Sequence, residues 1–122
     1  MRELAGWTGV GLLAVLGALA RITVDAAVRR RVRLQFPLPT LAVNTSASLA
    51  LGVLAGAGTS GWALRLAGAA LIGSFSTFST WMLESGRLAD EGEPFAAGLN
   101  VVGSLLLGLG AVALGWSIGA VL

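Results

Sequence analysis

The sequence predicts an all-α integral membrane protein with four transmembrane helices. Of its 122 residues, 56% are hydrophobic and 11% are charged, and the mean hydropathy is +0.86. A soluble domain carries about 25% charged residues, so this chain is too apolar to cover itself with a water-compatible surface. Its apolar residues also fall into four runs, each close to the roughly 20 residues that a membrane-spanning helix needs.

Loop and turn signals separate the four runs. The predicted spans cover about 4–28, 38–57, 62–85 and 95–122, which makes residues 1–122 a single four-helix membrane domain. After the loop "RRRVRLQFPLP", Pro37 and Pro39 mark the start of the second span, because proline fits the first turn of a helix. "GTSG" predicts a short turn before the third span, and the charged loop "GRLADEGEP" ends at Pro94 before the fourth.

The chain contains 18 glycines, and two groups of them predict close helix packing. "GVLAG" at 52–56 and "GWSIG" at 115–119 each place glycines four residues apart. Helices associate in lipid through such small-residue pairs, because the backbones can approach closely there. A four-helix unit of this size is too small to enclose a pathway alone, so we expect it to oligomerise.

The composition excludes several classes of function. The chain has no cysteine, histidine, lysine or tyrosine, which excludes thiol chemistry, Cys/His metal sites and the usual nucleophile–base pairs of an enzyme. Four of the eight arginines lie in "RRRVR", too few and too local for a nucleic-acid surface. This cluster predicts a cytoplasmic anchor beside a helix end, and a contact with anionic lipid is the alternative.

Arginine counts predict an orientation in the membrane. With four spans, the two charged loops share one face and both termini share the other. The arginines of the loop face are Arg29, Arg30, Arg31, Arg33 and Arg87, whereas the terminal face has Arg2 and Arg65. The positive-inside rule then places the loops in the cytoplasm and the termini outside.

Polar residues within the spans are the candidates for function. Arg21 lies near the end of the first span, with Asp25 one helical turn further on. It is either a snorkelling arginine in an i,i+4 ion pair or a positive charge that concentrates anions at a pore mouth. On the second span Thr40, Asn44 and Ser48 recur every fourth residue and so form one polar stripe.

Hydroxyl groups crowd into the third span directly after Gly73. They belong to Ser74, Ser76, Thr77, Ser79 and Thr80. A hydroxyl in a membrane helix usually bonds to its own backbone, but five together predict that the helix is interrupted. Freed backbone carbonyls are tolerated there only if they are buried in protein or bind an ion. Phe78 and Trp81 share a face with this segment, and their positive ring edges beside hydroxyl and amide donors suit a small anion.

Four motifs in order resemble one known family. They are "GALAR" ending at Arg21, "PTLAVNTSAS" around Asn44, "GSFSTFSTWMLE" in the third span and "SLLLGL" at 104–109. Together they resemble the small bacterial fluoride channels called Fluc or CrcB. The resemblance covers essentially the whole chain and implies a passive, fluoride-selective channel of the bacterial inner (plasma) membrane that exports cytoplasmic fluoride.

The resemblance also implies an assembly and a set of site residues. The family forms an antiparallel, dual-topology dimer in the lipid bilayer, with two pores that both chains line. A structural sodium ion would be held by the backbone carbonyls of Gly73 and Ser76, Arg21 would lie at the vestibule, and Glu84 would be the acidic position that closes the third motif. The implied fluoride pathway comprises Asn44, Phe78, Thr80, Trp81, Asn100 and Ser104.

Two residues depart from the family pattern on the pore lining. Trp81 replaces a second phenylalanine, and Asn100 replaces a tyrosine expected on the fourth span. These departures and the unequal arginine distribution favour a heterodimer with a sister chain that inserts the opposite way, over a homodimer. A non-conducting partner subunit remains an alternative. A small multidrug-resistance-type exchanger is a remote one, because the first span has no carboxylate before Asp25.

Overall fold

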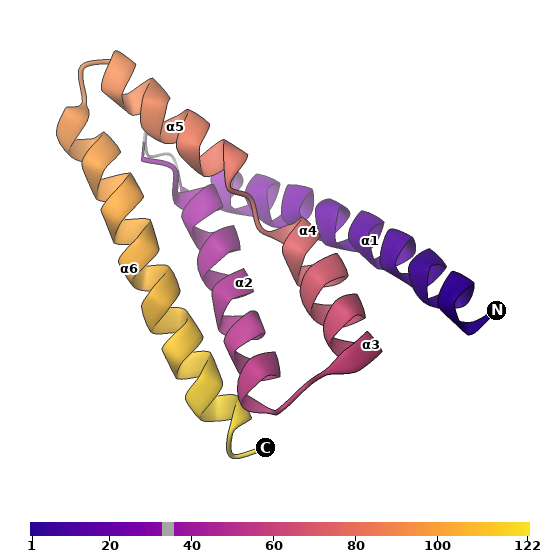
Figure 1. Cartoon of the computed structure of the whole chain (residues 1–122). Coiled ribbons are helices and arrows are strands. Elements are labelled where there is room, and N and C mark those ends of the chain that lie inside the picture. Colours follow the sequence, from indigo (N-terminus) through magenta and orange to yellow (C-terminus); the bar gives the residue numbers. More distant parts are fainter. Residues whose placement is uncertain (33–35) are drawn as a thin grey trace.

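Every regular element that the structure describes is helical (Figure 1). The computed structural model describes residues 1–32 and 36–122, so Arg33, which we assigned to the loop face, lies outside the described residues. The elements are α1 (Arg2–Arg31), α2 (Leu38–Gly56), α3 (Gly61–Ala63), the π-helical segment η1 (Leu64–Ile72), α4 (Gly73–Phe75), α5 (Ser79–Asp90) and α6 (Pro94–Gly119).

Four helical stretches are long and apolar enough to cross a membrane. They are Arg2–Arg31, Leu38–Gly56, Gly61–Asp90 and Pro94–Gly119. The prediction of four spanning helices is therefore confirmed. Large apolar side chains such as Leu12, Leu106 and Ile118 are exposed on the outside. An outer surface of this kind suits lipid rather than water.

The third span is broken in the middle, as the hydroxyl cluster predicted. Helix α4 ends at Phe75, Ser76 has an extended backbone with φ −75° and ψ 163°, and α5 begins at Ser79. The helix then continues to Asp90, through part of the charged segment that we assigned to a loop. An ion pair between Arg87 and Glu91, at 3.4 Å, supports this last turn outside the apolar region.

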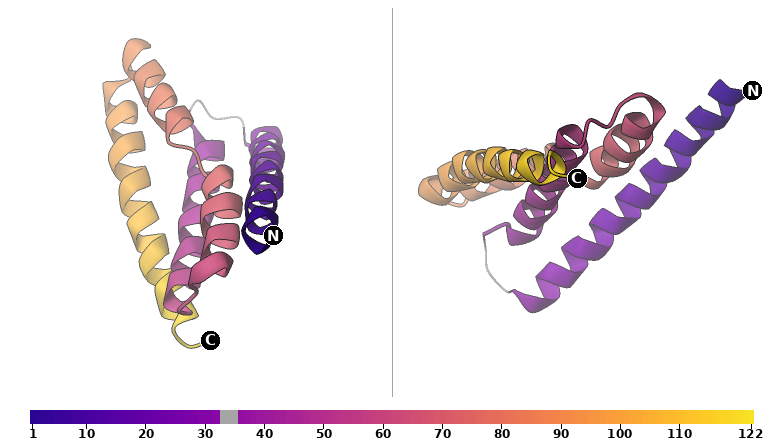
Figure 2. Two further views of the ribbon diagram at one scale, coloured as in Figure 1. Left: turned by 45° about the vertical axis from the view of Figure 1, so that its right-hand side comes forward. Right: turned by 90° about the horizontal axis from the view of Figure 1, so that it is seen from below.

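The break changes the neighbour against which the third span packs. Before it, η1 and α4 contact α1, whereas α5 contacts α6 after it. Helix α2 contacts both halves of the third span, and Figures 1 and 2 show α1 crossing obliquely on the side away from α6. The break therefore lies at the centre of the bundle, beside α2.

The closest contact in the bundle joins α2 to α6 through the predicted glycine pairs. A Cβ atom on Gly52 or Gly56 would collide with the backbone carbonyls of Val112 and Trp116. A Cβ atom on Gly115 or Gly119 would collide with backbone carbonyls of α2 in the same way. The two motifs thus pack against each other, which the sequence alone did not show.

Candidate functional site

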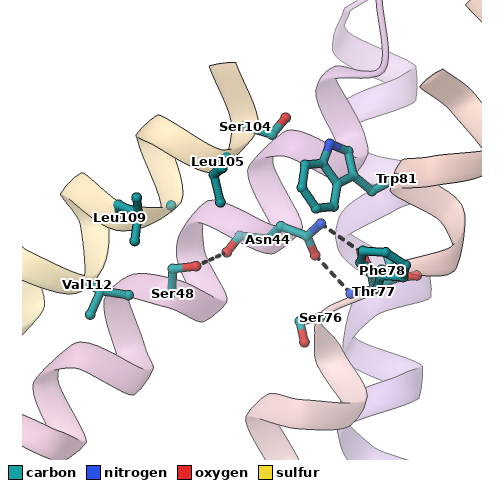
Figure 3. Close-up of a pocket in the computed structure, with 11 residues that line it drawn as sticks. Asn44, Ser48, Ser76, Thr77, Phe78, Trp81, Ser104, Leu105, Leu109 and Val112 are labelled. Carbon is teal, nitrogen blue, oxygen red and sulfur yellow. Dashed lines mark hydrogen bonds between the residues drawn. The ribbon is translucent and has the colours of Figure 1, made fainter. Parts of the chain in front are cut away.

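Asn44 bridges α2 to the break in the third span (Figure 3). Its Nδ2 donates to the backbone carbonyl of Thr77 at 2.8 Å, and its Oδ1 accepts from the Thr77 backbone N–H, also at 2.8 Å. One side chain therefore satisfies both polar groups of a residue that lies outside any helix. Unpaired, those groups would be costly in a membrane interior, so Asn44 makes the break possible.

The break releases two backbone carbonyls. In an uninterrupted helix, Gly73 would accept from the N–H of Thr77, and Ser76 from the N–H of Thr80. Here the N–H of Thr77 donates to Asn44, and the N–H of Thr80 donates to the Thr77 hydroxyl at 3.3 Å. The Gly73 carbonyl keeps only a side-chain donor, the Ser76 hydroxyl at 3.2 Å. Both carbonyls named for the sodium site have thus lost their helical partners.

A pocket of about 320 Å³ lies beside the break, between α2, α5 and α6. Its lining is Asn44, Ser48, Ser76, Thr77, Phe78, Trp81, Ser104, Leu105, Gly108, Leu109 and Val112. Figure 3 shows the polar groups of α2 and the break on one side and the leucine and valine side chains of α6 on the other. The structure thus brings together four of the predicted pathway residues, Asn44, Phe78, Trp81 and Ser104.

Phe78 and Trp81 form an edge-to-face pair at one wall of the pocket. Their ring centroids are 5.7 Å apart and their planes meet at 83°. The Phe78 ring is 70% exposed, although it lies near the middle of a membrane span. Both rings line the pocket, and the edges of aromatic rings carry partial positive charge.

Asn100 lies behind this wall and does not line the pocket. It is 1% exposed, and its Nδ2 donates to the Ser85 hydroxyl at 2.8 Å. Its backbone carbonyl accepts from the Trp81 indole N–H at 3.0 Å. The shared helical face of Asn100 and Ser104 is real, but Ser104 reaches the pocket and Asn100 turns toward α5.

A second pocket, of about 210 Å³, opens beside α1 and also reaches the break. Its lining includes Arg21, Asp25, Thr40, Thr77 and Thr80, so the arginine predicted for the vestibule and the threonine predicted for the pathway meet here. The Asp25 carboxylate pairs with Arg29 at 2.8 Å, one turn beyond it, rather than with Arg21. The ion pair between Arg21 and Asp25 of our first interpretation is therefore not formed, and the role of Arg21 as a charge that concentrates anions at a pore mouth stays a prediction.

Glu84, the last residue of the third motif, forms a hydrogen bond with α2. Its Oε1 accepts from the Thr40 hydroxyl at 2.7 Å, at the upper end of the polar stripe. Two members of the polar stripe, Thr40 and Asn44, therefore bond to the broken span, one helical turn apart. Ser48 itself donates back to the Asn44 carbonyl at 2.8 Å.

Sequence reasoning missed three features of the site. It did not assign a role to Thr77, whose peptide and hydroxyl organise the break, or to Ser85, which binds Asn100. It also missed the α6 lining residues Leu105, Gly108, Leu109 and Val112. Those residues follow Ser104 at helical spacing, so the face of Ser104 was the signal that could have found them.

Comparisons with known proteins identify the family. A family model described as "CrcB-like protein, Camphor Resistance (CrcB)" matches residues 8–116. A protein of Mycolicibacterium paratuberculosis named "Fluoride-specific ion channel FluC 2" is 46% identical over 115 residues, which is 94% of each chain. A protein of the same name from Mycobacterium tuberculosis is 43% identical over 109 residues, covering 89% of this chain and 86% of that one.

The similarity extends beyond the mycobacteria. A "Fluoride-specific ion channel FluC 2" from Haloarcula marismortui is 43% identical over 109 residues, covering 89% of each chain. These matches span the polar stripe of α2, the break and the α6 wall. Its four spanning helices make the chain a multi-pass membrane protein. The chain therefore belongs to the CrcB family.

Proposed function

We propose that this protein is a subunit of a passive, fluoride-selective channel in the inner (plasma) membrane of a bacterium. Hydrogen fluoride enters a cell as a neutral weak acid and ionises in the cytoplasm, and the channel lets the anion leave down its electrochemical gradient. The observation that carries the proposal is the pocket beside the break, where Asn44, Phe78, Trp81 and Ser104 meet. The relatives' names, which specify fluoride, support the choice of ion.

The chemistry of the pocket favours an anion. None of the described residues that line it is ionisable, and they offer no carboxylate for a cation or for a proton relay. Asn44 uses one Nδ2 proton on the Thr77 carbonyl and retains a second. Amide, hydroxyl and ring-edge donors together replace the hydration of a small anion without a fixed charge that would trap it.

The exposure of Phe78 supports an assembly of two chains. Phe78 is 70% exposed even though it pairs with Trp81, and hydrocarbon against this open wall would leave the amide and hydroxyl groups of the pocket without partners. An antiparallel dimer would place a second chain against this wall. We favour a heterodimer with a sister chain over a homodimer, because the arginines are unequally distributed and several relatives carry the numbers 1 and 2.

Fluoride efflux from liposomes that hold the purified chain tests the function. We expect fast efflux, read with a fluoride electrode, that chloride does not replace, either from this chain alone or after co-expression with a sister chain. Efflux from the chain alone would establish a homodimer and contradict the heterodimer. Folded, inserted protein that is silent in both preparations would contradict the channel and favour a structural partner.

We further propose a structural sodium ion bound by the carbonyls of Gly73 and Ser76. Sodium prefers oxygen ligands, and both carbonyls have lost their helical N–H donors to Asn44 and Thr77. Neither carbonyl belongs to a charged group, which fits a monovalent ion. Its contribution would be to hold the broken ends of the third span in register.

Removal of sodium should therefore destabilise the folded protein. A ligand that binds only the folded state adds about 2.7 kcal/mol at a hundredfold excess over its Kd. We expect the thermal midpoint of unfolding to fall when N-methylglucamine replaces sodium at constant ionic strength, and to return when sodium is restored. An unchanged midpoint across the full range of sodium concentrations would contradict the site.

A further inference from the structure

The wall of the pocket formed by α5 and α6 is held from behind by one buried amide. Asn100 is 1% exposed, and its Nδ2 lies 2.8 Å from the Ser85 hydroxyl and 3.5 Å from the Trp81 carbonyl. The Ser85 hydroxyl donates to that same carbonyl at 2.9 Å. These hydrogen bonds form a three-membered network between α5 and α6, made by Asn100, Ser85 and the backbone of Trp81.

The same residue also engages two side chains of the pocket wall. The Trp81 indole N–H donates to the Asn100 backbone carbonyl at 3.0 Å, and the Ser104 hydroxyl donates to Asn100 Oδ1 at 3.3 Å. Trp81 and Ser104 line the pocket, whereas Asn100 does not. Figure 3 shows the indole nitrogen on the side of the ring that faces away from Phe78.

We propose that Asn100 is a positioning residue for Trp81, and that it acts on the ion pathway without touching the ion. Its side chain fixes the turn of α5 that carries Trp81, and its carbonyl holds the indole N–H away from the pocket. Trp81 then presents only ring carbons beside Phe78, as a phenylalanine would. The inference deepens the proposed function, and it rests on that function only for its effect on transport.

Burial makes this arrangement sensitive to the loss of any partner. Among the residues that the structure describes, no buried side-chain polar atom lacks a hydrogen-bond partner. Removing Ser85 would leave the Asn100 amide with only its 3.5 Å contact to the Trp81 carbonyl, and removing the amide would leave the Ser104 hydroxyl without its acceptor. Either loss disfavours the packed state of the two helices. The turn of α5 would then move, and the indole with it.

Proton exchange at the Trp81 indole tests the proposal directly. The chain has four tryptophans, at 7, 62, 81 and 116, so a spectrum of 15N-tryptophan protein in detergent shows four indole N–H signals. The signal lost in Trp81→Phe belongs to Trp81. We expect Asn100→Leu, and to a smaller extent Ser85→Ala, to speed hydrogen–deuterium exchange of this signal by about tenfold or more.

The other three indoles serve as internal references. Trp7 packs against Trp62 at the other end of the bundle, and Trp116 lies in the last turns of α6, so none of the three should change. Ser117→Ala, at an exposed hydroxyl of α6 that bonds its own helix, is the matched control and should leave all four signals unchanged. Unchanged exchange at Trp81 in both Asn100→Leu and Ser85→Ala would overturn the proposal.

A double-mutant cycle separates positioning from a general structural role. In the assembly that conducts, Asn100→Leu should slow fluoride efflux by about tenfold. In the Trp81→Phe background the same change should slow efflux by clearly less, because the effects of coupled neighbours are not additive. Equal losses in both backgrounds would show that Asn100 does not act through Trp81. The exchange measurement needs no transport, so it tests the positioning role of Asn100 even if the protein is not a channel. Likewise, fluoride efflux tests the channel even if Asn100 does not position Trp81.

Discussion

Asn44→Ala is expected to abolish fluoride efflux. The change removes both hydrogen bonds to the Thr77 peptide, each 2.8 Å long, and leaves a backbone N–H and a carbonyl unpaired in mid-membrane. Each unpaired group costs about 1–3 kcal/mol, and every 1.4 kcal/mol corresponds to about a tenfold change in population. Efflux from liposomes should therefore fall by about a hundredfold or more. The break would lose its geometry, and the pocket would lose its main amide donor.

A matched variant exists on the same helix. Ser46 is exposed and bonds only to carbonyls of α2, so Ser46→Ala should conduct at the wild-type rate. Asn44→Leu sharpens the test, because it keeps a side chain of similar volume and removes both hydrogen bonds to the Thr77 peptide. Efflux at the wild-type rate from either Asn44 variant would show that the break does not depend on this bridge.

Gly115→Ala is expected to destabilise the bundle strongly. The added Cβ would collide with the Leu49 carbonyl of α2, and a backbone atom cannot move aside as a side chain can. Overpacking of this kind typically costs about 1–3 kcal/mol. We expect the free energy of unfolding to fall by this amount in SDS titrations. Efflux should fall too, because Asn44 and Ser104 face the pocket from the two helices that must separate.

Gly110→Ala provides the control for this change. Gly110 lies on the same helix, and a Cβ atom there would meet nothing within 4 Å. Its substitution should leave stability unchanged or raise it slightly, because alanine is the better helix former. Equal effects of the two substitutions would show that the α2–α6 contact is looser than the structure indicates.

The assignment to the membrane proteins, the four spans and the break all follow from local properties of the sequence. Hydropathy over about 20 residues identifies a span whatever its neighbours are. A cluster of hydroxyl groups after Gly73 competes with helical hydrogen bonding within the same segment. These predictions needed no knowledge of which helix packs against which, and the structure confirms them.

Only the tertiary structure decided which side chains contact each other. Helical spacing predicted that Asn100 and Ser104 share a face, but the structure turns Asn100 toward Ser85 and leaves Ser104 at the pocket. The same spacing allowed Asp25 to pair with Arg21 or Arg29, and the structure pairs it with Arg29.

The glycine motifs also separate what the sequence predicts from what only the structure shows. The sequence by itself determined that "GVLAG" and "GWSIG" would pack closely, and only the structure decided that they pack against each other. The physical reason is that periodicity reports the angle of a residue around its own helix axis. The group that faces that angle depends on which helices pack together, and the structure packs α2 against α6 while the break after Phe75 passes the third span from α1 to α6.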